Sequence, residues 1–259
     1  MQRRIVIPFP DLQIPLAPAR IPVLAIITAA MEEEATPIRE IAAAKGNVVR
    51  LGLKGSLQLL TVEDATLALV TTGIGLTNAA SSLTAALSYV SPRYIFSCGS
   101  AGGLDAKATV GEVTASSDCV YGRADAREFG YELGQVPGMP ASYVADEDLL
   151  SRFTALPAQL GHTTTRAGRF LSSDCFVSAE LAVEFRKLFP SAITADMEST
   201  ALAQVAAGVE VPFLAIRGIS DLCGPEAAAD NYQRAPEASR LSFLVALCLI
   251  GLREPEEIA

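Results

Sequence analysis

Two short stretches, Ala195-Asp196-Met197-Glu198-Ser199-Thr200 and Arg217-Gly218-Ile219-Ser220-Asp221, decide how this chain can fold. In each of them an apolar, strand-like run ends in an isolated carboxylate. A third such ending lies near the N-terminus, in Ile26-Ile27-Thr28-Ala29-Ala30-Met31-Glu32-Glu33-Glu34. In an open α/β sheet the ligand binds at the carboxyl ends of the strands. The pattern therefore predicts an enzyme whose pocket can bind hydroxyl groups, hold a proton and orient a water molecule.

Strand-like and helix-like segments alternate along the rest of the chain. The run from Ile21 to Thr28 is apolar throughout, as in a strand that is buried on both faces. Alternating strands and helices predict a largely parallel sheet, and a hairpin around Glu63-Asp64-Ala65 makes the sheet mixed. We predict an α/β fold: a single domain with a central mixed, mostly parallel β-sheet flanked by helices. The expected strands are 21–28, 57–62, 66–72, 94–97, 112–121, 165–170, 192–195 and 211–217, and the expected helices are 32–44, 77–90, 146–155, 178–188, 198–207 and a C-terminal helix. Residues 122–145 are expected to form an ordered functional loop.

The bulk composition excludes several classes of protein. Half of the 259 residues are apolar and 19% are charged, so we expect a large core and no long disordered region. A net charge of −9 argues against binding to nucleic-acid polymers, which depends on clustered Lys and Arg. This charge does not exclude a small nucleoside.

The cysteines and the single histidine argue against metal or nucleophile sites. The five cysteines form no CxxC pair, so we expect mostly buried thiols and no structural metal. His162 is expected to be exposed in a loop. A Ser-His-Asp or Cys-His nucleophile system would have to use this residue and is therefore disfavoured.

The two ends of the chain predict a location. The apolar stretch 241–252 is too short to span a bilayer. Residues 1–20 carry several prolines that interrupt any resemblance to a signal peptide. We predict an N-terminal proline-rich extension over 1–20, a catalytic domain over 21–252, a cytoplasmic location and no membrane partner.

Each carboxylate has an ordinary structural explanation when it is taken alone. Glu198 could complement the dipole of a helix that begins there, and Asp221 could cap a helix. The run Glu32-Glu33-Glu34 could mark a solvated helix face. Their shared position after buried strands favours a site over these explanations.

A glycine-rich segment, Gly99-Ser100-Ala101-Gly102-Gly103, follows one of the expected strands. The small residues would let a ligand approach the backbone. The segment is neither a dinucleotide fingerprint nor a P-loop, since it lacks both GxGxxG and Gly-Lys-Ser/Thr. No Lys or Arg stands beside it, which makes phosphate a poor candidate ligand for this pocket.

Taken together, several motifs resemble one enzyme family. They are Met31-Glu32-Glu33-Glu34, Gly73-Ile74-Gly75, Gly99-Ser100-Ala101-Gly102-Gly103, Phe129-Gly130-Tyr131-Glu132, Gly134-Gln135-Val136-Pro137-Gly138, Asp196-Met197-Glu198 and Ile219-Ser220-Asp221. Over about residues 21–250, in this order, they resemble the 5'-methylthioadenosine/S-adenosylhomocysteine nucleosidases of the nucleoside phosphorylase superfamily. The resemblance implies a nucleoside phosphorylase-like fold and a small purine nucleoside as the ligand.

The three carboxylates have counterparts in that family. The resemblance implies that Glu34 orients and activates the attacking water, and that Asp221 gives a proton to purine N7. It also implies that Glu198 holds the ribose hydroxyls. These roles suit the chemistry, because cleavage of an N-ribosidic bond builds positive charge on the sugar and negative charge on the departing base. Neither a metal nor an organic cofactor is implied.

The remaining implied site residues fall into four groups by the part of the ligand they match. The groups are Met197 and Arg217 at the sugar; Ser100, Ala101, Gly102, Phe176, Val177 and Ser220 at the purine; Met31 and Ile74 at the 5'-alkylthio group; and Phe129 and Pro137 from a neighbouring subunit. The last group implies a homodimer.

The chain departs from the family pattern in several places. Gly122-Arg123 stands in place of a His-Asp pair, Asp196 in place of a glutamate, and Ala126 in place of a larger apolar residue. Because Ala126 matches a position near the 5'-group, the preference at that group stays open. Tyr232, in a stretch that aligns poorly, is our candidate for a further pocket wall.

The leading hypothesis is hydrolysis of the N-ribosidic bond of 5'-methylthioadenosine with release of adenine, and S-adenosylhomocysteine stays open as a second substrate. One alternative is a phosphate-dependent purine nucleoside phosphorylase, although such enzymes typically carry an arginine where this chain has Phe96-Ser97-Cys98. Another is hydrolysis of a different adenine nucleoside such as aminodeoxyfutalosine. A nucleoside-binding protein without activity is disfavoured, because all three expected carboxylates are present.

Overall fold

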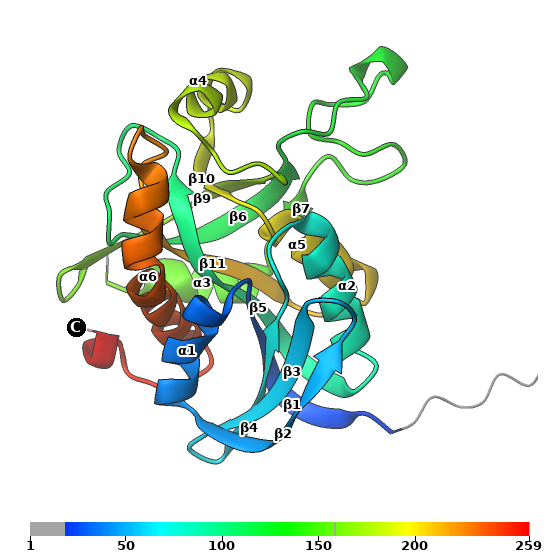
Figure 1. Ribbon diagram of the computed structural model, residues 1–259, viewed down its shortest axis with the longest axis vertical. Coiled ribbons are helices and arrows are strands. Elements are labelled where there is room, and N and C mark those ends of the chain that lie inside the picture. Colours follow the sequence, from blue (N-terminus) through cyan, green and yellow to red (C-terminus); the bar gives the residue numbers. More distant parts are fainter. Residues whose placement is uncertain (1–18, 158, 259) are drawn as a thin grey trace, which may run out of the picture.

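A mixed β-sheet forms the centre of the molecule, and helices cover both of its faces (Figure 1). The computed structural model describes residues 19–157 and 159–258. The strands follow the order β10-β9-β6-β11-β5-β1-β4-β3-β2, with β7 paired to β6 and β8 paired to β9. Their bounds are β1 Ile21–Ala29, β2 Ala43–Leu51, β3 Gly55–Val62, β4 Ala65–Thr71, β5 Val90–Gly103, β6 Val113–Tyr121, β7 Tyr143–Val144, β8 Gln159–Leu160, β9 Thr163–Ser172, β10 Ala192–Asp196 and β11 Phe213–Asp221.

The central strands run in parallel. β1 pairs in parallel with β4 and β5, and β5 pairs in parallel with β11. The carboxyl ends of these strands therefore lie at one edge of the sheet. β10 pairs with β9 and also, in the antiparallel sense, with Gly102 and Gly103 at the end of β5. This second pairing closes β5, β11, β6, β9 and β10 into a ring, which brings the end of β10 beside the end of β5.

Helices pack against the sheet in three clusters of the core, two large ones and a smaller one that contains α4. The bounds are α1 Glu32–Ile41, α2 Leu76–Ala86, α3 Glu147–Ala155, α4 Ala179–Leu188, α5 Ser199–Gly208 and α6 Ala227–Leu249, with short 3-10 helices η1 Arg127–Phe129 and η2 Pro255–Ile258. α1, α3 and α6 cover one face, and α2 and α5 cover the other. In β1, Ala25 and Ile27 join the first cluster while Val23 and Ile26 join the second. Burial on both faces is what its apolar run predicts, and the predicted fold class is confirmed.

Several expected elements have different bounds in the structure; the helix expected over 77–90, for example, ends at Ala86, and β5 begins at Val90. The helix expected over 32–44 ends at Ile41, and β2, which the sequence did not predict, follows directly. β2 lies at the edge of the sheet with most of its residues exposed, so it shows no apolar alternation. The strand expected over 94–97 extends to Gly103, because its glycine-rich end pairs with β11 and β10.

The predicted boundaries at residues 20 and 252 can be compared with the first and last described residues of the chain. The predicted proline-rich extension lies outside the described residues except for Ala19 and Arg20. At the other end, packing continues past residue 252, since Ile258 of η2 is buried in the core cluster of α6. No helix in the described part of the chain is long and apolar enough to cross a membrane.

Candidate active site

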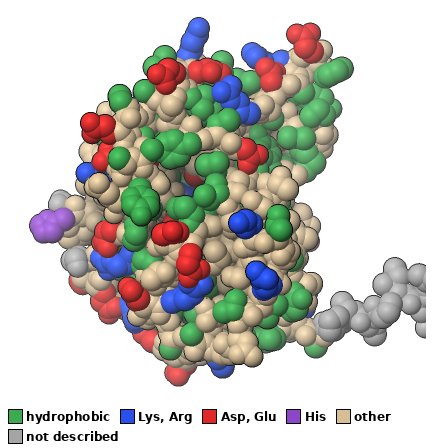
Figure 2. Space-filling model, viewed as in Figure 1, with side chains coloured by type: hydrophobic (Ala, Val, Ile, Leu, Met, Phe, Trp, Pro, Cys, Tyr) green, Lys and Arg blue, Asp and Glu red, His purple; other side chains and the backbone are tan. Residues whose placement is uncertain are grey.

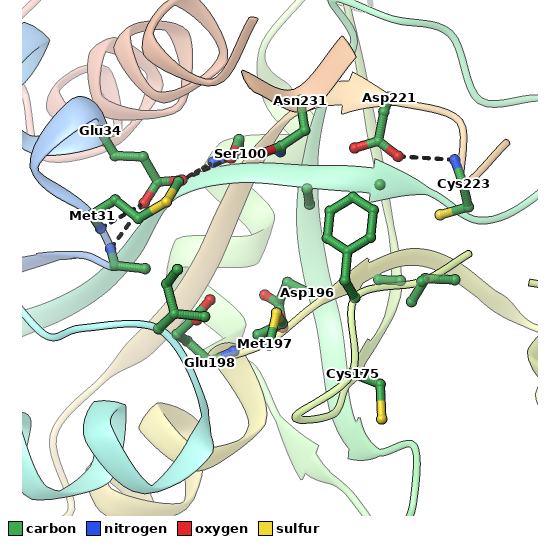
Figure 3. Close-up of a pocket in the computed structure, with 17 residues that line it drawn as sticks. Met31, Glu34, Ser100, Cys175, Asp196, Met197, Glu198, Asp221, Cys223 and Asn231 are labelled. Carbon is green, nitrogen blue, oxygen red and sulfur yellow. Dashed lines mark hydrogen bonds between the residues drawn. The ribbon is translucent and has the colours of Figure 1, made fainter. Parts of the chain in front are cut away.

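One cavity lies where the carboxyl ends of β1, β5, β10 and β11 meet (Figure 3). Its lining consists of Ala30, Met31, Glu34, Ile74, Ser100, Ala101, Gly102, Cys175, Phe176, Val177, Ala195, Asp196, Met197, Glu198, Asp221, Cys223 and Asn231. Figure 2 shows a hollow near the middle of this face of the molecule, with apolar side chains around it and acidic side chains beside it. The three carboxylates that the sequence singled out all face this one cavity.

Glu34 enters the cavity from the first turn of α1, just after β1. It is only 3% exposed, yet its carboxylate accepts four hydrogen bonds. Oε1 accepts from the backbone N–H and the hydroxyl of Ser100, both at 2.8 Å. Oε2 accepts from the backbone N–H groups of Ala30 at 2.9 Å and Met31 at 3.3 Å. A Cβ at Gly99 would lie 2.9 Å from Oε1, so glycine is what lets this carboxylate lie against β5.

Glu198 precedes the first residue of α5 and is buried. Its Oε1 accepts from the backbone N–H of Gly75 at 2.9 Å, in the turn before α2. Burial, and then the nearby Asp196 carboxylate, raise the pKa of Glu198 above its ordinary value, against the opposing effects of Arg217 and the Gly75 N–H. The cavity therefore holds a carboxyl group that takes up a proton more readily than an exposed glutamate does.

Asp221 is the last residue of β11 and is also buried. Its Oδ1 accepts from the backbone N–H of Cys223 at 2.9 Å, and its Oδ2 accepts from the Ser220 hydroxyl at 3.1 Å. Burial raises the pKa of Asp221, although these two hydrogen bonds act in the opposite direction. The group is suited to holding a proton that it can give to a ligand.

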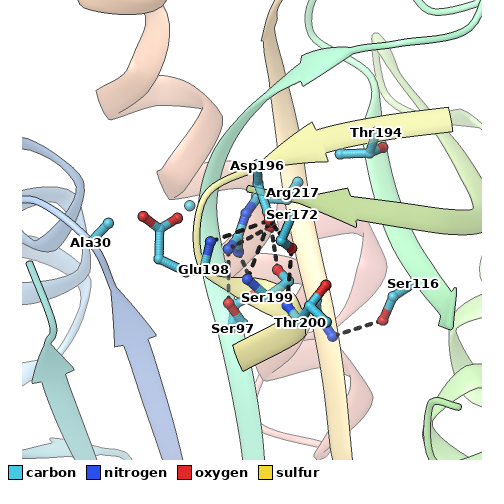
Figure 4. A network of polar contacts seen from close by, with 12 residues as sticks. Ala30, Ser97, Ser116, Ser172, Thr194, Asp196, Glu198, Ser199, Thr200 and Arg217 are labelled. Atoms are coloured by element: carbon cyan, nitrogen blue, oxygen red, sulfur yellow. Dashed lines mark hydrogen bonds and ion pairs between the residues drawn. The ribbon is translucent and has the colours of Figure 1, made fainter. Parts of the chain in front are cut away.

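A buried ion pair lies directly behind Glu198 (Figure 4). Arg217 Nη2 lies 3.0 Å from Asp196 Oδ2 and donates to the Ser97 hydroxyl at 2.8 Å. Asp196 Oδ1 accepts from the Ser172 hydroxyl at 2.5 Å and from the backbone N–H of Ser199 at 3.2 Å. The network joins β5, β9, β10, α5 and β11, and it balances the charge of Arg217 against that of Asp196, one of the two acids next to it.

Most of the residues proposed from the sequence line the cavity. These are Glu34, Asp221, Glu198, Met197, Ser100, Ala101, Gly102, Phe176, Val177, Met31 and Ile74. Arg217 and Ser220 do not line it. Arg217 instead forms an ion pair with Asp196 and a hydrogen bond with Ser97 behind the lining residues. Ser220 forms hydrogen bonds with Asp221 and the Ala101 carbonyl.

Phe129 and Pro137 lie away from this chain's own cavity. Both are exposed, Phe129 to 82%, on the segment between β6 and β7, which projects from the body of the molecule at the upper right of Figure 1. Ala126 precedes η1 on the same segment and does not line the cavity either. Tyr232 as a pocket wall is wrong, because its side chain points outward and is 83% exposed. The preceding residue, Asn231, is the one on that turn which reaches the cavity.

Sequence reasoning missed several lining residues. They are Ala30, Cys175, Ala195, Asp196, Cys223 and Asn231. Asp196 directly precedes Met197 and Glu198, and this position in the sequence was the signal that could have identified it as a lining residue. Asn231 had no such signal, because it lies on α6 and only the packing of that helix on the sheet brings it to the cavity.

Histidine and metal-ligand geometry add little to this site. His162 lies exposed in a turn, as expected, and is the purple side chain at the margin of Figure 2. Among residues 19–157 and 159–258, no group of three His, Cys, Asp or Glu side chains could hold a metal ion. The carboxyl groups of the cavity can transfer protons, orient water and bind hydroxyl groups.

Known proteins share both the sequence and the fold of this chain. The model of the phosphorylase superfamily matches residues 24–249. The 5'-methylthioadenosine/S-adenosylhomocysteine nucleosidase of Geobacillus sp. (strain WCH70) is 36% identical over 226 residues, which cover 87% of this chain and 97% of that protein. The enzyme of the same name from Staphylococcus aureus (strain MRSA252) is 36% identical over 202 residues, covering 78% of this chain and 87% of that protein.

Two solved structures extend the likeness to three dimensions. The nucleosidase of Colwellia psychrerythraea, in complex with adenine, has a TM-score of 0.80 and 28% identity, covering 89% of this chain and 95% of that one. The nucleosidase of Neisseria meningitidis, in complex with methylthio-immucillin-A, has a TM-score of 0.81 and 29% identity, covering 88% and 97%. This chain thus belongs to the phosphorylase superfamily and, within it, to the family of 5'-methylthioadenosine/S-adenosylhomocysteine nucleosidases.

Proposed function

We propose that this protein hydrolyses the N-ribosidic bond of 5'-methylthioadenosine, releasing adenine, and that S-adenosylhomocysteine is its second substrate. The observation that carries the proposal is the convergence of Glu34, Glu198 and Asp221 on one cavity. The names of the relatives support the substrates, and the bound adenine of the Colwellia enzyme supports the product.

Asp221 is the proposed acid. The departing adenine takes the electrons of the N-ribosidic bond, and a proton at N7 makes it a better leaving group. Burial favours the protonated form of Asp221, as the raised pKa indicates. Because the protonated form is the active one, the rate of hydrolysis should fall as the pH rises through this pKa.

Glu34 and Glu198 are the proposed partners of the sugar and the water. Four donors fix the Glu34 carboxylate in place, so that it can orient a water molecule toward the sugar. Glu198 faces the cavity from the start of α5 and can accept from the ribose hydroxyls. Glu34, and Glu198 when it is ionised, stabilise the positive charge that develops on the sugar.

The charge of the lining favours water over phosphate as the nucleophile. Among the described residues that line the cavity there is no Lys or Arg, while four are Asp or Glu. Arg217 is engaged by Asp196 and Ser97. A phosphate ion would meet carboxylates without a free cation to offset them, which disfavours the phosphorylase alternative.

The function is tested by incubating the protein with 5'-methylthioadenosine, S-adenosylhomocysteine and aminodeoxyfutalosine in phosphate-free buffer that contains EDTA. We expect adenine and the free sugar that still carries its 5-alkylthio group from the first two nucleosides, since the proposed reaction needs neither phosphate nor a metal. Chromatography of the bases and sugars measures both products. Strict dependence on phosphate, with a sugar 1-phosphate as the product, would show a phosphorylase instead.

Nearly isosteric changes test the two catalytic roles. Glu34→Gln and Asp221→Asn should each lower kcat by roughly 100-fold or more, because each removes a proton-transfer or water-orienting group. The exposed neighbour Glu33 provides the matched control, and Glu33→Gln should keep the wild-type kcat. Thermal unfolding checks that each variant is folded. Wild-type turnover in either of the first two variants would refute that residue's role.

The proposal includes a homodimer in which Phe129 and Pro137 complete the neighbouring subunit's site. Its support is the position of these residues, exposed on a projecting segment and far from their own cavity. An exposed Phe side chain is costly to leave in water, and the rim of the cavity includes the half-exposed apolar Ile74 and Phe176.

Hybrid dimers test whether Phe129 acts across subunits. Phe129→Ala should raise KM by roughly tenfold through lost apolar contact, whereas Leu53→Ala, another exposed apolar position, should not. When Phe129→Ala and the inactive Glu34→Gln are mixed and reassociated, hybrids should regain the wild-type KM, because the Glu34→Gln subunit supplies Phe129. Light scattering should give twice the mass of one 27.2 kDa chain. A monomer, or hybrids without a restored KM, would contradict the proposal.

A further inference from the structure

Asn231 reaches the cavity between Glu34 and Asp221 (Figure 3). It belongs to the second turn of α6 and is half-buried. Its amide nitrogen donates to the Ser220 hydroxyl oxygen at 2.9 Å and, over a longer contact of 3.4 Å, to the Ser100 hydroxyl oxygen. One side chain thus contacts two serines that belong to two different strands, β11 and β5.

Each of these serines in turn contacts one of the two proposed catalytic carboxylates. The Ser100 hydroxyl donates to Glu34 Oε1 at 2.8 Å. The Ser220 hydroxyl lies 3.1 Å from Asp221 Oδ2 and 3.2 Å from the Ala101 carbonyl oxygen. The carbonyl oxygen can only accept a hydrogen bond, and so can Asp221 Oδ2 while Asp221 is ionised, so the hydroxyl is the donor. Asn231 is therefore the shared end of two short hydrogen-bond chains, one to each carboxylate.

The chemistry of the amide gives these chains a direction. A serine hydroxyl has one proton to donate, whereas the amide nitrogen of asparagine can only donate. When Asn231 donates to a serine oxygen, that serine's own proton must point elsewhere, and the nearby acceptors are the carboxylates and the Ala101 carbonyl. A hydroxyl that accepts one hydrogen bond also donates a stronger one.

The helix that carries Asn231 is fixed to the same site by two further serines. The Ser239 hydroxyl donates to the Glu34 backbone carbonyl at 2.9 Å, and the Ser242 oxygen accepts from the Gly99 N–H at 3.0 Å. Both serines are fully buried. α6 therefore holds Asn231 at a set position relative to β5 and Glu34.

We propose that Asn231 is a positioning residue that aligns the hydroxyls of Ser100 and Ser220, so that they donate to the carboxylates of Glu34 and Asp221. The proposal rests on the proposed function for the roles of those two carboxylates. It assigns to α6 a part in aligning the acid and the water-orienting group together.

Replacement by aspartate is the sharpest kinetic test, because Asn231→Asp keeps the shape of the side chain but turns its donor into an acceptor. The serine protons would then be drawn toward position 231 and away from Glu34 and Asp221. We expect kcat to fall by roughly tenfold or more, which corresponds to the loss of about one charge-assisted hydrogen bond, with KM little changed. Asn231→Ala, which leaves the hydroxyls free to rotate, should lower kcat by less.

Two control variants should match the wild type in kcat. Asn47→Asp adds the same charge on the exposed strand β2, and Tyr232→Ala alters the exposed face of the same turn of α6.

Titration of the Asp221 carboxyl by carbon-13 NMR gives a readout that does not depend on turnover. Burial, and to a smaller extent the charge of Asp230, raise the pKa of Asp221, while the hydrogen bonds from Cys223 and Ser220 lower it. Asn231→Asp removes that hydrogen bond and adds a like charge, so the pKa of Asp221 should rise, and with it the high-pH limb of the activity profile. Asn231→Ala should give a smaller rise.

The outcomes separate this proposal from the proposed function. A wild-type kcat in Asn231→Asp, or an unchanged Asp221 titration in both variants, would overturn the role of Asn231 alone. Failure of the wild-type protein to release adenine would instead overturn the proposed function, and the titration would still decide the role of Asn231. If Asn231→Asp does not fold, Asn231→Ala carries both measurements.

Discussion

The burial of several carboxylates around one cavity is the constraint on which the rest of the structure depends. A carboxylate removed from water is costly unless hydrogen bonds or an opposite charge compensate for it. Arg217 compensates Asp196 directly. Among the described residues, no Arg side chain forms an ion pair with Glu34, Glu198 or Asp221, and these carboxylates accept mainly from backbone N–H groups. Hydrogen bonds from the backbone therefore provide most of the compensation, and the nearby Arg217 adds to it for Glu198.

The sheet supplies those N–H groups because its strands end where the helices begin. Glu34 follows β1, Glu198 follows β10 and Asp221 ends β11. The pairing of β10 with the end of β5 turns the chain so that Glu198 approaches from the side opposite to α6. Burial raises the pKa of Glu198 and of Asp221, each of which accepts from one backbone N–H group. In the proposed reaction the raised pKa suits Asp221 to its role as the acid.

The sequence predicted those parts of the molecule that depend on local pattern. Continuous apolar runs such as 21–28 indicated buried strands, and carboxylates just after such runs indicated the site. It could not predict features that depend on packing between distant segments. β2 is held by pairing with β3 along an exposed edge, which leaves no apolar signature. Asn231 reaches the cavity, and Tyr232 does not, because of the rotation of α6 about its axis when it packs against β5 and β11. The sequence of α6 does not indicate this rotation, because Pro236 interrupts the helix and its C-terminal half is apolar over a long stretch.

In the proposed complex three buried acids surround a single nucleoside, and a crystal structure of Asp221→Asn with bound 5'-methylthioadenosine is the sharpest test of that arrangement. We expect the intact nucleoside in this cavity, with both ribose hydroxyls within hydrogen-bonding distance of Glu198. Purine N7 should face the side chain at position 221, and a water held by Glu34 should lie on the opposite side of the sugar. A nucleoside bound outside the cavity, or with its ribose turned away from Glu198, would refute the proposed arrangement.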